Sequence, residues 1–206
     1  MITIIDYGMG NVMSIYNMLK KTGHKSVISS AIADIEKADK LILPGVGAFD
    51  LGMNQLESMG VRNVLNKRVV EGKVPILGIC LGMQLFANQS EEGSGQKGLG
   101  WLNASVKKIN PSYNGKSIRI PHMGWNEVKV VKTSRLMLDL PLDSRFYFVH
   151  SFYLETHDES DTLLRTEYGQ VFTSAIEHEN IVGVQFHPEK SHRFGMGLLK
   201  NFVEKY

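Results

Sequence analysis

The fold of this chain is decided by the stretch Gly78-Ile79-Cys80-Leu81-Gly82, which contains its only cysteine. We expect an apolar strand directly before the cysteine, over Val74–Ile79, and a helix directly after it, over Leu81–Asn88. A chain that leaves a strand and enters a helix within so tight a turn needs glycines two positions to either side of the residue at the apex. The stretch therefore predicts an α/β fold with a nucleophile elbow that carries a thiol.

Short apolar runs alternate with helical patterns through the first half of the chain. This alternation predicts a parallel sheet with helices on both faces. Strands are expected over Ile2–Ile5, Lys25–Ile28, Lys40–Leu43 and Val74–Ile79, and helices over Asn11–Thr22, Val61–Glu71 and Leu81–Asn88.

The second half consists mostly of closely spaced strand patterns, which predict antiparallel strands appended to the α/β core. Few helical patterns interrupt them before a helix expected over Gly195–Lys205. Surface loops are expected over Glu91–Gly100 and Asn110–Lys116, which are polar and glycine-containing. The strands are expected over Val106–Ile109, Glu127–Val131, Phe146–Val149, Phe152–Glu155, Leu163–Thr166, Val171–Ile176 and Ile181–Phe186.

Length and composition restrict the class of protein. The chain has 206 residues, 43% hydrophobic and 21% charged, which fits one ordinary globular domain over residues 1–206. A formal net charge of +2, without a block of Lys and Arg, argues against a nucleic-acid partner. One cysteine excludes an intramolecular disulfide, and no residue cluster indicates a metal. We find no signal peptide and no apolar run of the ~20 residues a membrane helix needs, so we expect a cytoplasmic protein without membrane contact.

Cys80 is interpreted as a nucleophile. The elbow would place its thiol at a helix N-terminus, where the helix dipole favours the thiolate, the nucleophilic form. The next backbone N–H, that of Leu81, would point to where an oxyanion develops. The alternative is a buried core cysteine, which is what most lone cysteines are. The order of strand, glycines and helix favours the nucleophile.

A base and its orienting carboxylate are candidates in His187-Pro188-Glu189, which follows an apolar strand. The residue before a proline is biased to an extended conformation, in which residues i and i+2 point the same way. Glu189 would then hold one ring nitrogen of His187 and leave the other for Cys80, as in a catalytic triad. The alternatives are a surface turn at this place, and His150 as a base that lacks a carboxylate nearby in sequence.

A second glycine turn, Pro44-Gly45-Val46-Gly47, follows a strand whose carboxyl end should lie beside the elbow. Its two glycines leave backbone N–H groups free to form an oxyanion hole or a phosphate cradle. The turn is not a P-loop, because the Gly-Lys-Ser/Thr ending is missing. The alternative is a tight turn without a chemical role.

Two segments, Gly78–Gln84 and Gln185–Ser191, resemble the triad motifs of class I glutamine amidotransferases. Further segments resemble, within that family, the glutaminase subunits of imidazole glycerol phosphate synthase. The resemblance extends from Ile2 to Phe202. These further segments are Asp6–Asn11, Leu43–Phe49, Ser90–Gly93, Pro121–Asn126 and Tyr147–Ser151.

The resemblance implies a flavodoxin-like open parallel sheet and a glutaminase reaction. Cys80 would attack the side-chain amide of glutamine, and His187, oriented by Glu189, would protonate the departing ammonia. Water would then hydrolyse the glutamyl thioester. The oxyanion would be held by the N–H of Leu81 and by a backbone N–H between Gly45 and Gly47, a turn thought to need rearrangement in this subfamily.

The resemblance also implies substrate and partner contacts, and no cofactor. Gln84 and the backbone of Ser151 and Phe152 match positions that bind the amino-acid end of glutamine. Ammonia would pass into a synthase (cyclase) subunit of the (β/α)8-barrel type, in a heterodimer, which forms imidazole glycerol phosphate and an aminoimidazole carboxamide ribotide in histidine biosynthesis. The docking face would carry Asn11, Met123, Trp125 and Lys190.

Three alternative functions stay open, and one of them rests on a departure from the family pattern. After Ser191 the family commonly continues with small or polar residues, whereas this chain has His192-Arg193-Phe194-Gly195-Met196. This departure leaves the choice of partner open. A paralogous glutaminase would supply a different synthase, such as one that modifies surface sugars. A stand-alone cysteine hydrolase would act without any partner, and a non-catalytic module would keep only the fold. Met123 and Trp125 form an apolar pair that suits an interface, and the alternative is that both are core residues.

Overall fold

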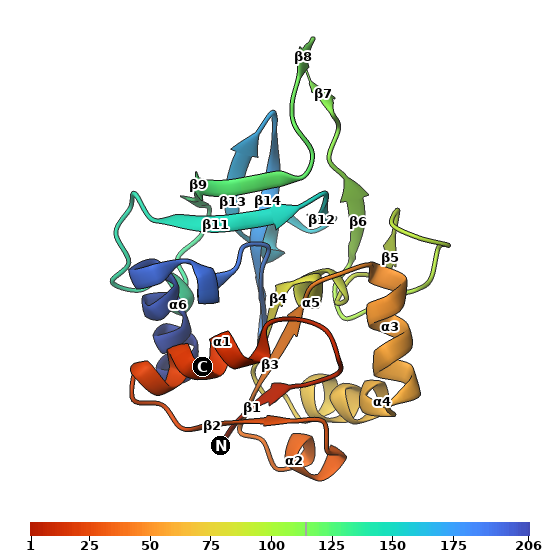
Figure 1. Ribbon diagram of the computed structural model, residues 1–206, viewed down its shortest axis with the longest axis vertical. Helices are drawn as coiled ribbons and strands as arrows, with labels where there is room; N and C mark the ends of the chain where they lie inside the picture. Colours follow the sequence, from red (N-terminus) through yellow and green to blue (C-terminus); the bar gives the residue numbers. More distant parts are fainter. Residues whose placement is uncertain (114) are drawn as a thin grey trace.

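The computed structural model describes residues 1–113 and 115–206. Its centre is a parallel sheet in the strand order β2-β1-β3-β4-β15 (Figure 1), which is the flavodoxin-like order with β15 as the fifth strand. The sequence prediction of an α/β fold with a parallel sheet is therefore confirmed. The strands are β2 (Ser26–Ser29), β1 (Ile2–Ile5), β3 (Lys40–Gly45), β4 (Ile76–Cys80) and β15 (Ile181–Val184).

Antiparallel strands extend this sheet beyond β15, as expected for the second half of the chain. β14 pairs with β15, β12 with β14, and β6 with β12, all antiparallel, and the short β5 pairs parallel with β6. β13 pairs with β14 and with β10. The bounds are β14 (Gln170–His178), β12 (Phe152–Thr156), β6 (Ala104–Lys108), β5 (Gln89–Ser90), β13 (Thr162–Tyr168) and β10 (Lys129–Val130).

Among the described residues, two small two-stranded sheets stand apart from the main sheet. β9 (His122–Glu127) pairs antiparallel with β11 (Arg145–His150). β7 (Ser112–Tyr113) pairs with β8 (Lys116–Ser117) within the expected loop Asn110–Lys116, of which Asn114 lies outside the described residues. The sequence missed β9 as a strand: its short alternation carries only two strongly apolar residues, Met123 and Trp125, and they lie on the exposed side while His122 is buried.

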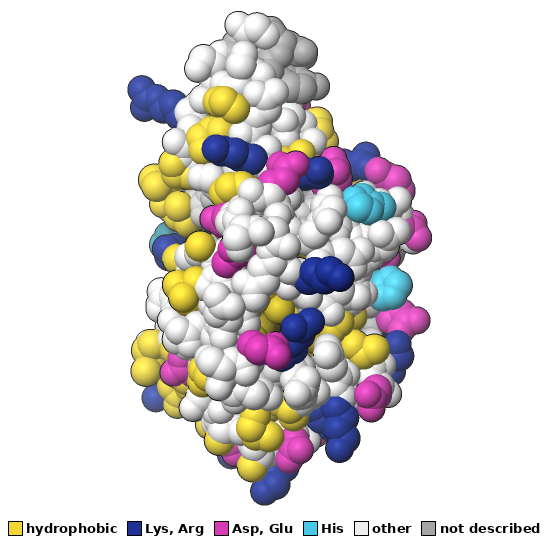
Figure 2. Space-filling view, turned by 90° about the vertical axis from the view of Figure 1, so that its right-hand side faces the viewer, with side chains coloured by type: hydrophobic (Ala, Val, Ile, Leu, Met, Phe, Trp, Pro, Cys, Tyr) yellow, Lys and Arg dark blue, Asp and Glu magenta, His cyan; other side chains and the backbone are white. Residues whose placement is uncertain are grey.

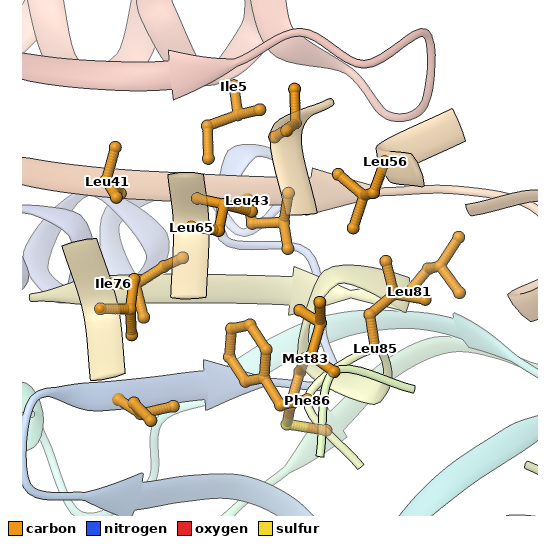
Figure 3. Close-up of a cluster of buried hydrophobic side chains, with 14 of the residues drawn as sticks. Ile5, Leu41, Leu43, Leu56, Leu65, Ile76, Leu81, Met83, Leu85 and Phe86 are labelled. Atoms are coloured by element: carbon orange, nitrogen blue, oxygen red, sulfur yellow. The ribbon is translucent and has the colours of Figure 1, made fainter. Parts of the chain in front are cut away.

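Helices cover both faces of the parallel sheet, and each face has its own buried apolar cluster. One cluster packs α2, α3, α4 and α5 against the sheet (Figure 3), and the other packs α1 and α6. The helices are α1 (Val12–Lys21), α2 (Ile32–Glu36), α3 (Phe49–Ser58), α4 (Val61–Leu65, continued by a π-helical segment Asn66–Glu71), α5 (Leu81–Gln84) and α6 (His192–Lys205). Short 3₁₀ turns occur at Arg135–Met137, Glu159–Asp161 and Pro188–Lys190.

Helix α1 shows how local sequence sets these elements. Its N-cap Asn11 accepts a hydrogen bond from the Ser14 N–H at 3.4 Å. Ile15 and Leu19 lie four positions apart and are both fully buried against the sheet. The helix ends before Gly23, which has φ +84°, a conformation that glycine adopts without strain.

Helix α5 is shorter than the eight-residue helix expected after Cys80. It ends at Gln84. The next backbone carbonyls, which would accept hydrogen bonds within a longer helix, instead accept them from N–H groups of the following loop. Leu99 N–H donates to the Leu85 carbonyl at 2.8 Å, and Trp101 N–H donates to the Phe86 carbonyl at 3.0 Å. The expected dipole of a long helix is therefore reduced to one turn.

The described surface has mixed charge. On the face shown in Figure 2, acidic and basic side chains are interspersed and apolar ones form small groups, so no large patch of one sign appears on its described part. Within the described residues, no helix has both the length and the apolar character needed to cross a membrane.

Candidate active site

The elbow forms where the sequence predicts it, at the end of β4. Cys80 has φ 53° and ψ −110°, a conformation that costs a non-glycine residue about 1–3 kcal/mol. Gly78 is required beside it, because a Cβ there would lie 2.6 Å from the Phe86 ring. Gly82 faces the backbone of β3 more closely still, because a Cβ there would overlap the Leu43 carbonyl oxygen. The glycines thus allow close packing that holds the strained cysteine in place.

The Pro44–Gly47 turn packs directly onto the elbow, as the position of β3 predicts. A Cβ on Gly45 would lie 2.7 Å from the backbone nitrogen of Gly82 and from the Cβ of Leu81. Gly47 has φ +126°, in the region that favours glycine. This turn and the first residues of α5 therefore pack against each other, and both line the same cavity as Cys80.

His187 follows β15 and is almost completely buried. Its backbone N–H donates to the Tyr147 carbonyl at 2.8 Å, and its Nδ1 donates to Glu189 Oε1 at 2.8 Å. Its Nε2 is also buried and has no hydrogen-bond partner of ordinary length among the described residues. Glu189 therefore fixes the orientation of the His187 ring through Nδ1, while Nε2 stays available for another group.

The charge state of His187 follows from these neighbours. Burial disfavours the imidazolium and by itself lowers the pKa, but interactions with Cys80 and Glu189 outweigh burial and raise the pKa of His187 to about 10. At neutral pH the His187 ring is therefore protonated and is able to act as a proton donor.

Cys80 and His187 both line one cavity of about 280 Å³. The carboxyl end of the parallel sheet forms one side of it, which is where sites gather in open α/β folds. Gly45 and Glu189 stand directly behind the cavity wall, the first against Leu81 and the second against His187. Other expected residues that line the cavity are Gly47, Leu81, Gln84, Ser151 and Phe152.

Gln84 and Gln185 connect the cavity wall to the thiol. Gln84 Nε2 donates to the Phe152 carbonyl at 2.9 Å and to Gln185 Oε1 at 3.0 Å. Gln185 Nε2 in turn lies 3.6 Å from Cys80 Sγ and donates to it. Gln185 was missed from the sequence, although it stands two positions before His187, and residues i and i+2 of an extended chain share one side.

Glu92 was also missed, and it is the acidic side chain that lines the described cavity. Its Oε2 accepts a hydrogen bond from the Phe49 N–H at the start of α3, at 3.0 Å. Burial raises the pKa of this carboxyl, with the Phe49 N–H opposing and nearby Asp50 adding to the rise. The segment Ser90–Gly93 was part of the resemblance, but nothing in its spacing indicated which carboxylate turns inward.

His150 lines the cavity but is not placed as a base. Its Nδ1 lies 2.8 Å from the Phe152 carbonyl and its Nε2 lies 2.9 Å from His122 Nδ1. Burial lowers the pKa of His150 to about 3, so the ring is neutral near pH 7. Both nitrogens of His150 are occupied, whereas Nε2 of His187 has no hydrogen-bond partner in the described part of the chain.

The four residues expected at a docking face are all at the surface. Met123 is 61% and Trp125 is 46% exposed, so neither is a core residue. Trp125 stacks on the His192 ring, with 5.5 Å between centroids and 8° between planes. The Pro188–Lys190 turn lies between α1, which Asn11 caps, and β11, the partner strand of β9. The four positions therefore belong to adjoining elements.

Comparisons with known proteins agree with this geometry. The family model described as glutamine amidotransferase class-I matches residues 3–206. The chain is 54% identical over 205 residues to imidazole glycerol phosphate synthase subunit HisH 2 of Methanococcus maripaludis, covering 100% of both chains. It is 48% identical over 204 residues to the protein of the same name from Pseudomonas aeruginosa, covering 99% of both. The HisH subunit of Leptospira interrogans is 43% identical over 203 residues, with 98% of this chain and 99% of that one covered.

Solved structures share the fold at lower sequence identity. A crystal structure described as a glutamine amidotransferase has a TM-score of 0.76 at 20% identity and covers 98% of this chain and 97% of its own. The structure of PurLQS from Thermotoga maritima has a TM-score of 0.72 at 15% identity, with 98% of this chain and 96% of that one covered. These likenesses support the fold.

Proposed function

The chain belongs to the class I glutamine amidotransferase family, and on that premise we propose that it is the glutaminase subunit of an imidazole glycerol phosphate synthase. The observation that carries the proposal is the single cavity shared by the strained Cys80 thiol and the Glu189-bound His187 ring. The full-length likeness to HisH proteins supports the choice of synthase and a role in histidine biosynthesis. We treat residues 1–206 as one glutaminase domain.

The proposed reaction splits amide hydrolysis into two acyl-transfer steps. The Cys80 thiolate attacks the side-chain carbonyl carbon of glutamine, and the N–H groups of Leu81 and of the Gly45–Gly47 turn stabilise the oxyanion. His187 donates its proton to the departing nitrogen, so that ammonia leaves and a glutamyl thioester remains. His187 then takes a proton from water, whose oxygen attacks the thioester to release glutamate and the thiolate.

The cavity offers complementary groups for the amino-acid end of glutamine. Glu92 would pair with the α-ammonium group, because it is the acidic side chain at the described wall. The backbone of Ser151 and Phe152 would bind the α-carboxylate. The two N–H donors of the Gln84 side chain are engaged with Phe152 and Gln185, so Gln84 would contact glutamine through its side-chain oxygen and by van der Waals packing.

The ammonia would pass to a synthase and would not be released to water, where protonation would remove its nucleophilicity. We propose a heterodimer with a (β/α)8-barrel subunit that docks on the surface formed by Asn11, Met123, Trp125 and Lys190. Exposed Met and Trp side chains are typical of interface centres. A cytoplasmic location is consistent with a reduced, reactive Cys80 thiol.

The test is to replace Cys80 with Ala in the complex with the synthase subunit. We expect glutamine hydrolysis to be lost, while ammonia added directly still supports the synthase reaction. Normal glutamine hydrolysis by the Cys80→Ala complex would overturn the assignment. Strong hydrolysis by the isolated wild-type chain would instead favour a stand-alone hydrolase.

A second candidate is a glutaminase for a different ammonia-using synthase. It is favoured by the His192 ring, which covers one face of Trp125 at the proposed docking surface and comes from the segment that departs from the family pattern. Purification of the complex from native cells distinguishes the two, because the co-purifying protein either forms imidazole glycerol phosphate or does not.

A further inference from the structure

A line of three hydrogen bonds, buried at its centre and part-buried at both ends, joins β9 to the cavity wall. Asn126 Nδ2 lies 3.2 Å from His122 Nε2, His122 Nδ1 lies 2.9 Å from His150 Nε2, and His150 Nδ1 lies 2.8 Å from the Phe152 carbonyl oxygen. His122 is 2% and His150 is 6% exposed. The two histidines are register partners on the paired strands β9 and β11.

The direction of every bond in this line is fixed by its ends. A carbonyl oxygen only accepts, so His150 Nδ1 carries the proton, and Nε2 of the neutral ring accepts. His122 Nδ1 must then donate to His150, which leaves His122 Nε2 as the acceptor for the Asn126 amide. Burial lowers the pKa of His122 to about 4 and of His150 to about 3, so both rings are neutral.

The surroundings hold the His122 ring and the Asn126 amide in place. His122 lies between the Phe148 ring at 4.7 Å and the Tyr168 ring at 4.0 Å, with planes within 24° and 21° of its own. Asn126 is fixed by a further bond from Nδ2 to the Glu167 carbonyl at 2.9 Å and by accepting the Glu127 N–H at 2.8 Å. The Asn126 amide orientation is therefore determined, and with it the direction of the line.

The line of hydrogen bonds ends at the carbonyl oxygen of Phe152, a residue that also lines the cavity. The Phe152 carbonyl accepts from His150 on one side and from Gln84 on the other, and Gln84 continues through Gln185 to the thiol. We propose that His122 and His150 are positioning residues that fix the Ser151–Phe152 backbone for glutamine binding. This inference rests on the proposed function, and it gives the two histidines no part in proton transfer.

The first test reads the tautomers of the wild-type complex by ¹⁵N NMR near pH 7. We expect both rings to be neutral and protonated at Nδ1, whereas a free histidine in water favours Nε2–H. A neutral Nε2–H form or a doubly protonated form of either ring would overturn the proposal. This measurement needs no variant, so it stands even where a substitution prevents folding.

The second test uses matched substitutions in the complex with the synthase subunit. His122→Phe keeps an aromatic ring between Phe148 and Tyr168 but removes the donor to His150, and His150→Leu removes the donor to Phe152. We expect each to raise KM for glutamine ~10-fold, as loss of about one hydrogen bond does, with kcat within ~3-fold of wild type. His150→Asn places an amide N–H near Nδ1 and should restore KM.

The control is His157→Phe, which changes a histidine bound to Ser105 Oγ at 3.1 Å outside the cavity and should leave KM unchanged. An unchanged KM in folded His122→Phe and His150→Leu complexes would overturn the proposal. If the wild-type complex fails to hydrolyse glutamine, the proposed function fails, whatever the tautomers are. If it hydrolyses glutamine and the variants match it, only the positioning role fails.

Discussion

Gly82 approaches Leu43 so closely that a β carbon on residue 82 would lie 1.9 Å from the Leu43 carbonyl oxygen. The contact joins the first turn of α5 to β3 and so holds the elbow against the Pro44–Gly47 turn. Because the atom in the way is backbone, it cannot move without shifting a central strand of the sheet.

Gly82→Ala is therefore expected to lower the free energy of unfolding by about 3 kcal/mol or more, at the upper end of overpacking effects. Chemical denaturation measures this loss. Gly95→Ala is the control, because Gly95 has φ +84° but open space around it, so only the ~1–2 kcal/mol cost of the left-handed conformation applies. Equal losses in the two variants would contradict the close contact.

Glu189→Gln removes a carboxylate that raises the pKa of His187. A histidine whose folded-state pKa is raised contributes stability that is complete below its unfolded pKa of 6.5 and disappears as pH rises toward about 10. We expect the variant to lose about 3 kcal/mol of stability at pH 6 and much less at pH 10. Urea denaturation across this range and NMR titration of His187 provide the measurement, and a pH-independent loss would contradict it.

The same Glu189→Gln variant should hydrolyse glutamine roughly 10²–10⁴-fold more slowly, because the ring of His187 is no longer held in its orientation. The comparison is kcat of the two complexes with the synthase subunit. Synthase activity with added ammonia is the control, and it should not change.

Gln185→Leu removes the donor to Cys80 Sγ and leaves the Gln84 amide without one acceptor. We expect kcat for glutamine hydrolysis and the rate of iodoacetamide labelling of Cys80 to change together, by about 10-fold, since a weak bond to sulfur and one buried polar bond are lost. Gln89→Leu, at an exposed position of β5, should leave both rates as they are. A changed kcat with unchanged labelling would mean that Gln185 does not act on the thiol.

Glu92→Gln tests the proposed contact with the α-ammonium group. KM for glutamine should rise roughly 10-fold or more, because a charge-assisted hydrogen bond becomes a neutral one. Burial raises the pKa of Glu92, so in the wild type glutamine affinity should weaken as pH falls through that pKa, and this acid limb should vanish in the variant. Glu91→Gln is the matched control, because Glu91 bonds to Lys107 and Lys108 instead.

The sequence predicted the elements whose residues carry a local signal. The elbow followed from glycine spacing, and the His187–Glu189 pair followed from the alternation of an extended chain, because both depend on the nearest neighbours in sequence. Helix α3 was missed because Gly52 interrupts its pattern, although this glycine leaves room for the Leu81 and Leu85 side chains, to which a Cβ at position 52 would lie as close as 3.3 Å. Tertiary contact, not local preference, makes α3 a helix.

The site was predicted less completely than the fold for the same reason. Glu92 turns toward the cavity because the start of α3 offers the Phe49 N–H as a donor, and α3 was itself absent from the prediction. The chain of hydrogen bonds from Asn126 to Phe152 links strands whose pairing is visible only in the structure, since β9 and β11 are far apart in sequence and β9 buries a histidine while it exposes its apolar residues. A residue whose role depends on hydrogen bonds between distant parts of the chain cannot be identified from the spacing of residues in the sequence.

The stack of Trp125 on His192 gives the protein an optical probe of its own. The chain has two tryptophans, and Trp101 is held away from the docking surface by its bond to Asn66 Oδ1 at 2.6 Å and its stacking on Phe86. Trp125 is 46% exposed and has one face against an imidazole. A partner that dehydrates Trp125 or displaces His192 will therefore change the intrinsic fluorescence, so that assembly can be followed in real time without a label.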